Sequence, residues 1–441
     1  MRKLDSAPNW VYGGLSPQVA DLRDKKHIRN LLNRLNDKYL YWDKIKYQKP
    51  PKDLTLEELW ILIKMKRSFD SKRIEFGNYK FQFNITDLIQ KQLHQFDLSI
   101  GGNLESKSLI PESDKQRYLI SSIMEEAIAS SQLEGAITTR KKAKEMLRKD
   151  KKPKNTSEQM IVNNYTTIKY IVKNKEQKLT KETLLNIHKL VTSKTLDNSE
   201  DEGRFRLDNE TKVVDPMDGE VHHTPPDFKE LNILISDLCS FFNDEKEKYF
   251  IHPIIKASII HFMVGYIHPF VDGNGRTARA LFYWYLLSKG YWLTEFLSIS
   301  KLIVKTRTQY ARAFQYSEID DNDITYFINY NLKVMDSAFE DLKNYLKRKI
   351  NEKKKTIEFQ KIKGVNERQA LMLKWLYEEP NLLFTVKEIE TRLSVSNQTA
   401  RTDLLTLVKQ GFLDLIYLNK KKQAFGKGKK FDKLISKILK K

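Results

Sequence analysis

The run from His268 to Arg279 limits the fold of this chain more than any other stretch. It reads His-Pro-Phe-Val-Asp-Gly-Asn-Gly-Arg-Thr-Ala-Arg, and an amphipathic segment, residues 280–287, follows it directly. It therefore places an imidazole, a carboxylate, two guanidinium groups and a pair of glycines around an amide in one short stretch. This order predicts a loop that opens a helix. Backbone N–H groups freed by glycine, together with the positive end of the helix dipole, bind anions such as phosphate.

Each residue type in the loop suits a step of phosphate chemistry. His268 is a candidate general base, because an unperturbed imidazole titrates near neutral pH. Asp272 offers a hard oxygen ligand for a Mg²⁺ ion that takes its other ligands from phosphates and water. Gly273 and Gly275 let the backbone approach a phosphate closely, and Asn274 can donate from its amide.

Two arginines complete the predicted anion site. Arg276 and Arg279 stand three residues apart in the first turns of the expected helix, so both guanidinium groups can reach one polyphosphate. Together these residues indicate a nucleotide-dependent transfer in which His268 deprotonates an incoming hydroxyl. The alternative is that Gly-Asn-Gly is an ordinary turn and that the His-Pro pair is structural. That alternative leaves the carboxylate and both arginines without a role.

The same run resembles the motif of the Fic family, His-x-Phe-x-(Asp/Glu)-Gly-Asn-Gly-Arg-x-x-Arg, at every defining position. Proteins of this family typically transfer AMP from ATP to a hydroxyl side chain of a target protein. The resemblance implies ATP as co-substrate, His268 as base, Asp272 as Mg²⁺ ligand and residues 273–275 as an anion hole. It also implies that Arg276 and Arg279 hold the β- and γ-phosphates. Relatives that transfer other groups usually have altered glycine or arginine positions, so the intact motif favours adenylylation.

A second match lies upstream of the loop. Residues 119–128 have apolar side chains at helical spacing, and Gly135 is suited to end that helix. The run from Ser130 to Gly135 resembles the family's inhibitory motif, (Ser/Thr)-x-x-x-Glu-(Gly/Asn). The resemblance implies that Glu134 pairs with Arg279 and competes with the γ-phosphate. Two alternatives remain: an exposed glutamate at a helix end, or a carboxylate that positions water for the removal of AMP from a modified protein.

A β-hairpin is expected between these two motifs. Val213 and Val214 precede the Pro/Gly-containing turn 215–219, and Val221 and His222 follow it. In Fic proteins a hairpin flap at this position holds the backbone of the target by strand addition. We do not expect the histidines here to bind zinc, because no cysteine or second histidine cluster completes a zinc set.

Composition indicates a soluble, cytoplasmic protein. The 441 residues exceed one ordinary domain, and the single cysteine excludes an intramolecular disulfide and indicates a reducing compartment. The N-terminus has no apolar stretch that would predict a signal peptide, and no window has the length of a membrane span, so no membrane partner is expected. The net charge of +21 permits an acidic partner such as nucleic acid.

The chain is expected to be mainly α-helical, with a Fic-type helical core and a β-hairpin flap. We predict an N-terminal helical region (1–111), a catalytic core that includes the inhibitory helix (112–345), a helical linker (346–364) and a C-terminal winged helix-turn-helix domain (365–441). Within the first region, residues 55–58 read as a capping box that begins a helix.

The C-terminal region resembles a winged helix-turn-helix, which some Fic proteins carry. Helices are expected over 367–377, 385–393 and 397–408, with β-strands over 412–418 and 423–425. Such a domain can bind DNA, and the candidate contact residues, on the third helix and the basic wing, are Asn397, Gln398, Thr399, Arg401, Thr402 and Lys421.

Three alternatives for function and assembly follow from this region and from the family. The winged helix can serve protein contact instead of DNA binding. The whole chain can be a DNA-binding regulator whose Fic region senses nucleotide or modifies itself. Family members are often dimers, so a homodimer is also open, and the target protein is not identified by the sequence.

Overall fold

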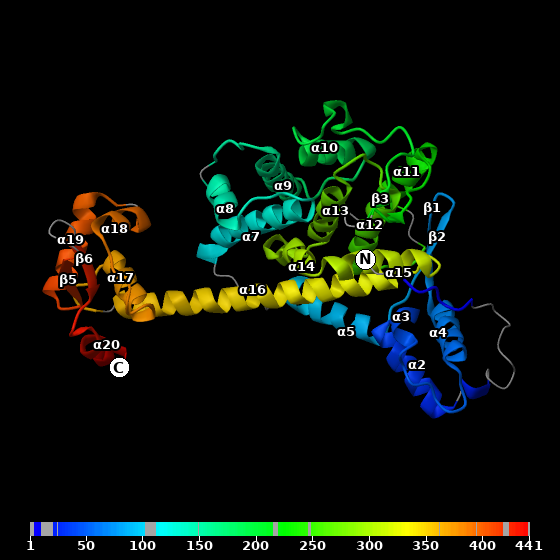
Figure 1. The fold of residues 1–441 in the computed structure, drawn as a ribbon, viewed down its shortest axis with the longest axis horizontal. Coiled ribbons are helices and arrows are strands. Elements are labelled where there is room, and N and C mark those ends of the chain that lie inside the picture. Colours follow the sequence, from blue (N-terminus) through cyan, green and yellow to red (C-terminus); the bar gives the residue numbers. More distant parts are fainter. Residues whose placement is uncertain are drawn as a thin grey trace. The chain divides into compact units, whose positions relative to one another are not determined.

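The computed structural model describes residues 4–9, 21–23, 25–101, 112–148, 150–214, 219–245, 248–360, 362–393, 395–417 and 423–439 (Figure 1). The chain divides into two compact units, Met1–Leu342 and Lys343–Lys441. Among the described residues, helices dominate, and the named strands form three separate two-stranded antiparallel hairpins. The prediction of a mainly α-helical protein is confirmed.

The N-terminal part of the first unit contains both helices and a hairpin. Its elements are α2 (Lys26–Lys38), α3 (Trp42–Ile45), α4 (Leu56–Asp70), β1 (Lys72–Phe76), β2 (Tyr79–Phe83), α5 (Asp87–Phe96) and the π-helical turn η1 (Asp97–Gly101). The predicted capping box is present: Thr55 and Glu58 each accept a hydrogen bond from the other's backbone N–H. The β1–β2 hairpin was not predicted, so this region is not helical throughout.

Buried polar contacts join this N-terminal part to the start of α16 (Thr325–Gln360). The Tyr39 hydroxyl donates to Asp323 at 2.6 Å, and Arg67 donates to the Tyr326 hydroxyl at 2.7 Å. A guanidinium and a carboxylate are buried at low cost only when such partners are supplied. The boundary expected at residues 111–112 therefore lies within one compact unit.

The rest of the first unit is a helical assembly around α12 (Pro253–Ile267) and α13 (Asn274–Ser288). Almost every residue of these two helices is buried, including the polar side chains in the first turns of α13. The elements around them are α7 (Glu112–Leu133), α8 (Arg140–Arg148), α9 (Thr156–Lys173), α10 (Lys181–Thr192), η2 (Ser199–Asp201), β3 (Val213–Val214), β4 (Val221–His223), η3 (Phe228–Glu230), α11 (Leu231–Phe242), η4 (Trp292–Phe296), α14 (Ile299–Lys305) and α15 (Arg307–Ile319).

The second unit has its own apolar core. It contains the end of α16, then α17 (Glu367–Glu378), α18 (Val386–Leu393), α19 (Asn397–Lys409), β5 (Leu413–Tyr417), β6 (Gln423–Lys427) and α20 (Phe431–Leu439). Strands β5 and β6 pair antiparallel, and side chains such as Leu373, Leu404 and Phe425 form the core. In the parts of the chain that the structure describes, no helix combines the length and apolarity needed to cross a bilayer.

Candidate active site

The predicted loop lies between the two central helices of the first unit. His268 follows α12 with a φ of 46°, and Gly273 caps the start of α13 with a φ of 85°. Glycine adopts this left-handed conformation without strain. A Cβ atom at Gly273 would also lie 2.7 Å from Cγ2 of Thr192, closer than atoms pack. The sequence Asp-Gly-Asn-Gly thus opens a helix, as the residue pattern predicted.

The geometry of His268 leaves one ring nitrogen available as a base. Nδ1 lies 3.2 Å from the carbonyl oxygen of Gly265, which can only accept, so Nδ1 carries the proton in this hydrogen bond. In the neutral ring Nε2 then has a free lone pair. Burial lowers the pKa of His268 from 6.5 to about 4, despite the opposing hydrogen bond to Gly265. The imidazole is therefore neutral at pH 7, the state that accepts a proton.

His188 supports the loop through contacts with two of its residues. One ring nitrogen accepts from the N–H of Gly203 at 3.0 Å, and the other donates to the carbonyl of Asp272 at 2.8 Å. Its ring stacks on Phe270 at 3.7 Å between ring centroids. Burial lowers the pKa of His188 to about 4, which keeps it neutral in this role. Sequence analysis did not identify this support, because no local pattern links residue 188 to the loop.

Arg206 and Asn274 fix the backbone of the loop. Arg206 donates from Nε to the carbonyl of His268 at 3.0 Å, and its own backbone N–H donates to the carbonyl of Pro269 at 2.9 Å. The side-chain amide of Asn274 bonds to both the N–H and the C=O of Phe270, at 3.0 and 2.8 Å. Asn274 thus uses its side chain to hold the loop, which leaves the backbone N–H groups of the first helical turn for an anion.

The two arginines of the motif have different surroundings. Arg276 is buried and donates to the carbonyl of Val191 at 3.2 Å and to Asp272 at 2.8 Å. Its Nε is a buried donor with no hydrogen-bond partner among the described residues. Arg279 points toward the end of α7, where its Nε donates to Ser130 Oγ at 3.0 Å. Arg276 therefore contacts the loop, whereas Arg279 contacts the helix that was predicted to be inhibitory.

Glu134 lies directly after α7 and contacts Arg279. The carboxylate accepts from the guanidinium at 2.8 Å, and the Arg279 side chain is only 2% exposed. The Glu134 carboxylate also occupies the space above Gly275, where an added Cβ atom would collide with Oε1. The structure thus brings together the glutamate, the second arginine and the glycine-rich helix start, which lie far apart in the sequence.

Helix α7 is held in place by a buried carboxylate. Glu126 accepts from the hydroxyl of Ser298 and from the backbone N–H of Ser300, each at 3.0 Å. Burial raises the pKa of Glu126, although the bonds from Ser300 oppose that shift. On α9, Asn164 donates to Ser131 Oγ at 2.8 Å. Sequence analysis missed Glu126, although a glutamate among the apolar positions of a helix is a signal of a buried polar contact.

The flap is a short hairpin beside this site. In the hairpin, Val213 of β3 pairs with His223 of β4, and His223 bonds to Glu318 on α15 at 2.7 Å. Val214 and Val221 are about half exposed. The hairpin agrees with the predicted strands. Most of the predicted turn lies outside the described residues: Asp215 to Asp218.

One cavity of about 240 Å³ brings many of the predicted site residues together. Its lining includes Glu134, Val213, His222, His268, Asn274, Gly275 and Arg279. Asp272 and Gly273 of the loop and Arg276 in the first turn of α13 lie outside this lining. The base, the helix start, the second arginine, the flap and Glu134 therefore share one space.

Asp272 is suited to Mg²⁺. Its side chain is 55% exposed, although it also accepts from Arg276. Mg²⁺ commonly takes only one or two carboxylates from a protein and the rest of its ligands from water and substrate phosphates. Within the described residues no group of three or more His, Cys, Asp and Glu side chains is arranged to hold a metal. A single accessible carboxylate beside an anion site fits the partial coordination that a nucleotide-bound Mg²⁺ requires.

The residues predicted to contact DNA belong to the second unit. The first turns of α19 expose Asn397, Gln398, Arg401 and Thr402, whereas Thr399 is partly buried and its N–H is capped by Ser396. Lys421 lies outside the described residues.

The fold and the site together define a helical domain that places a buried histidine beside the glycine-rich N-terminus of α13. Residues 178–286 match the family model described as "Fic/DOC family", and this segment contains the loop, His188 and the flap. Over this segment the chain is similar to the Fic/DOC family.

Two relatives at the sequence level share its central segment. The protein adenylyltransferases Fic of Aedes aegypti and Culex quinquefasciatus are each 38% identical over 87 residues, which cover 18% of this chain and 17% of the mosquito protein. The match thus spans less than a fifth of those relatives. A Fic-1 variant from C. elegans has a similar fold, with a TM-score of 0.50 and 17% identity over 76% of this chain and 86% of that chain.

Proposed function

We propose that this protein is a protein adenylyltransferase that transfers AMP from ATP to a hydroxyl side chain of a target protein or of itself. The observation that carries the proposal is the shared cavity, which His268 lines together with Gly275 and Arg279, while Nδ1 of His268 is engaged by the carbonyl of Gly265. A base, an anion-binding helix start and a buried cation are the groups that nucleotidyl transfer requires. The names of the mosquito relatives agree with this assignment.

The reaction places a hydroxyl oxygen of the target against the α-phosphorus of ATP. A new phosphorus–oxygen bond forms, the bond between the α-phosphorus and the bridging oxygen to the β-phosphate breaks, and pyrophosphate leaves. The hydroxyl proton goes to Nε2 of His268, which the hydrogen bond from Nδ1 to Gly265 keeps free. N–H groups at the start of α13 stabilise the charge that develops on the phosphate.

Asp272 would hold the Mg²⁺ that accompanies ATP, and the ion would supply charge neutralisation at the phosphates. Arg276 would keep Asp272 oriented through their 2.8 Å bond. Arg279 would contact the outer phosphates once Glu134 is displaced. The exposed backbone around Val214 and Val221 would pair with an extended segment of the target.

Glu134 would inhibit this reaction. Its carboxylate already uses the Arg279 guanidinium and stands over Gly275, so a γ-phosphate placed there would meet a negative charge at close range. The same carboxylate lines the cavity with His268 and is 28% exposed, which also suits it to position a water molecule. That second use would serve the removal of AMP from a modified protein.

The test is intact-mass measurement of wild type, Glu134→Gly and His268→Ala after incubation with Mg²⁺-ATP. We expect a mass gain of one AMP in Glu134→Gly, a smaller gain in wild type and none in His268→Ala. A pre-modified sample is then given to wild type and to Glu134→Gly without ATP. Loss of AMP only with wild type would favour removal as the activity. No gain in any protein, with ATP binding measured separately, would favour a DNA-binding regulator that senses nucleotide.

A further inference from the structure

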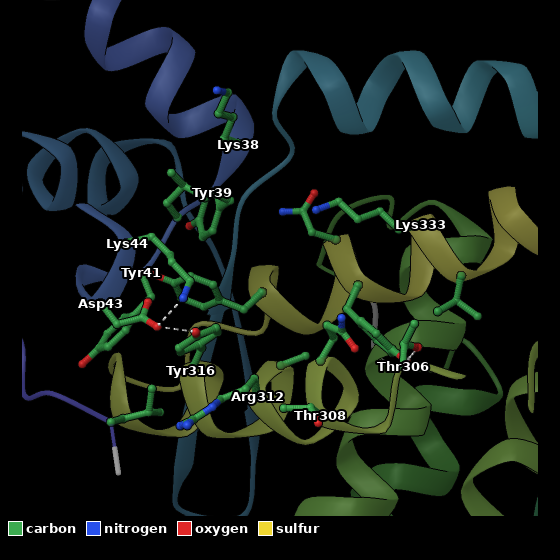
Figure 2. Close-up of a pocket in the computed structure, with 18 of the residues that line it drawn as sticks. Lys38, Tyr39, Tyr41, Asp43, Lys44, Thr306, Thr308, Arg312, Tyr316 and Lys333 are labelled. Carbon is green, nitrogen blue, oxygen red and sulfur yellow. Dashed lines mark hydrogen bonds and ion pairs between the residues drawn. The ribbon is translucent and has the colours of Figure 1, made fainter. Parts of the chain in front are cut away.

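A second cavity in the first unit is larger than the one that holds His268. It has a volume of about 690 Å³ and lies between the N-terminal helices and the helices α14, α15 and α16 (Figure 2). Pockets that bind small molecules typically have volumes of roughly 300–1,000 Å³ and mostly apolar walls with a few polar groups. Tyrosine rings supply much of the wall: Tyr39, Tyr41, Tyr47, Tyr316, Tyr326 and Tyr330.

Two polar atoms of lining residues have no hydrogen-bond partner. Nδ2 of Asn329, a residue that is 7% exposed, is a buried donor without an acceptor among the described residues. Oδ1 of Asp43 is likewise a buried acceptor without a donor there. Leaving such atoms unpaired is costly, and native proteins rarely do so without a bound partner. Both residues line the cavity, and a rotation of each side chain would let a ligand that offers an acceptor and a donor pair with them.

The charged residues around the cavity are mostly basic. Four lining residues are cationic and two are acidic. The acidic ones are already paired, Asp5 with Lys46 and Asp43 with Lys44. Figure 2 shows Lys333 extending from α16 toward the cavity. In the described part of the chain, Lys333 makes no ion pair with a carboxylate, and it stands one helical turn from Asn329.

We propose that this cavity binds a small organic anion that carries an aromatic ring, of the size of a nucleoside monophosphate. The ring would lie against the tyrosines, which provide large apolar surface with polar edges. Ring substituents would pair with Asn329 and Asp43. The anionic group would lie near Lys333 and Arg312, where charge-assisted hydrogen bonds are stronger than neutral ones.

This site is separate from the catalytic cavity, although both use α15. Arg312 and Tyr316 of α15 line the large cavity, whereas Tyr310 and Phe314 line the cavity that holds His268. Variants of Lys333 and Asn329 therefore change the large cavity without touching the residues of the catalytic one. The inference does not depend on the proposed transfer reaction, since binding alone tests it.

The first experiment is calorimetric titration of the full-length protein with AMP, GMP, CMP and UMP. We expect saturable binding of at least one, weakened about tenfold or more by Lys333→Ala and by Asn329→Leu. Lys152→Ala removes an exposed lysine outside the cavity and is the matched control.

The second experiment locates the ligand directly and does not depend on any variant folding. Wild type is irradiated with 8-azido-AMP, and the labelled peptides are identified by mass spectrometry. Label on residues 326–337 or 39–47 supports the proposal. The proposal is overturned by an absence of saturable binding for all four nucleotides, by binding that neither Lys333→Ala nor Asn329→Leu weakens, or by label confined to residues 268–279.

Discussion

Arg279, in the second turn of α13, donates a hydrogen bond to Glu134 at 2.8 Å, across 145 residues of sequence. The guanidinium is buried and makes its other bonds to Ser130. A buried cation retains its partners strongly, because losing them leaves an uncompensated charge. This contact ties the start of the glycine-rich helix to the end of α7.

Replacing Glu134 by Gly should increase AMP transfer. The change frees Arg279 and clears the space above Gly275, so ATP affinity should rise by about tenfold or more, the effect of removing one close like charge from a phosphate site. Titration with ATP and intact-mass measurement check this. Ser130→Ala removes one bond to Arg279 but keeps the ion pair, so it should have a much smaller effect. Equal ATP affinity in Glu134→Gly and wild type would contradict the competition.

Replacing Arg279 by Ala should weaken ATP binding more than AMP binding. The guanidinium is the cation proposed to contact the outer phosphates, so the loss should be about tenfold or more for ATP. The comparison is best made in the Glu134→Gly background, where the carboxylate no longer competes. Calorimetry with both nucleotides is the measurement. Equal losses for ATP and AMP would place Arg279 elsewhere in the nucleotide site.

His268→Ala should abolish transfer and leave nucleotide binding nearly intact. The pH dependence gives a sharper test. The pKa of His268 is lowered to about 4 by burial, so the base is unprotonated above that pH and activity should be lost only as pH falls through about 4. The rate of Glu134→Gly is measured from pH 4 to 8, with circular dichroism to show that the protein stays folded. An inflection near 6.5 would mean that His268 titrates as an ordinary exposed imidazole.

The buried His188 should make the protein less stable in acid. The pKa of His188 is about 4 in the folded state and near 6.5 in the unfolded state. The contribution of His188 to the free energy of unfolding is therefore fully present above pH 6.5 and is lost as the pH falls toward 4. The shift corresponds to about 3 kcal/mol of unfolding free energy as an upper estimate. Urea unfolding of wild type and His188→Gln over pH 4 to 7 measures it. The variant should show the shallower pH dependence, and parallel curves would exclude this account.

Glu126→Ala should destabilise the protein and loosen α7. It leaves the donors of Ser298 and Ser300 buried without their acceptor, at a cost of about 1–3 kcal/mol for each unsatisfied group. Glu126→Gln keeps one acceptor and should cost less. Thermal unfolding ranks the two variants. If α7 is loosened, Glu126→Ala should also raise AMP transfer, whereas a variant that is only less stable would lose activity.

Binding of DNA by α19 stays a prediction. If the exposed first turns of α19 contact phosphates, Arg401→Ala should weaken the binding of duplex DNA. It should also reduce the slope of the logarithm of the binding constant against the logarithm of the salt concentration by about one. Fluorescence anisotropy at several salt concentrations measures both quantities. Lys409→Ala, at the other end of the helix, is the control. The absence of binding to any duplex at low salt would favour a protein-contact role for this unit.

Local patterns predicted some elements well and missed others. The capping box at Thr55 was predicted from a few adjacent residues, because it acts within one helical turn. The β1–β2 hairpin was missed, although residues 72–83 alternate apolar and polar side chains around a Gly-Asn turn. That signal is short, and the neighbouring helical patterns outweighed it.

The sequence alone determined the loop: Gly273 and Gly275 permit the helix start, and the histidine, carboxylate and arginines stand within reach of it. It also determined that α7 ends near Gly135. Only the tertiary structure decided which groups meet there. His188 and Arg206 hold the loop, and Glu126 helps to hold the helix that brings Glu134 to Arg279. The reason is physical: backbone conformation depends on neighbouring residues, whereas buried polar groups are satisfied by whatever partner the packing of distant helices supplies.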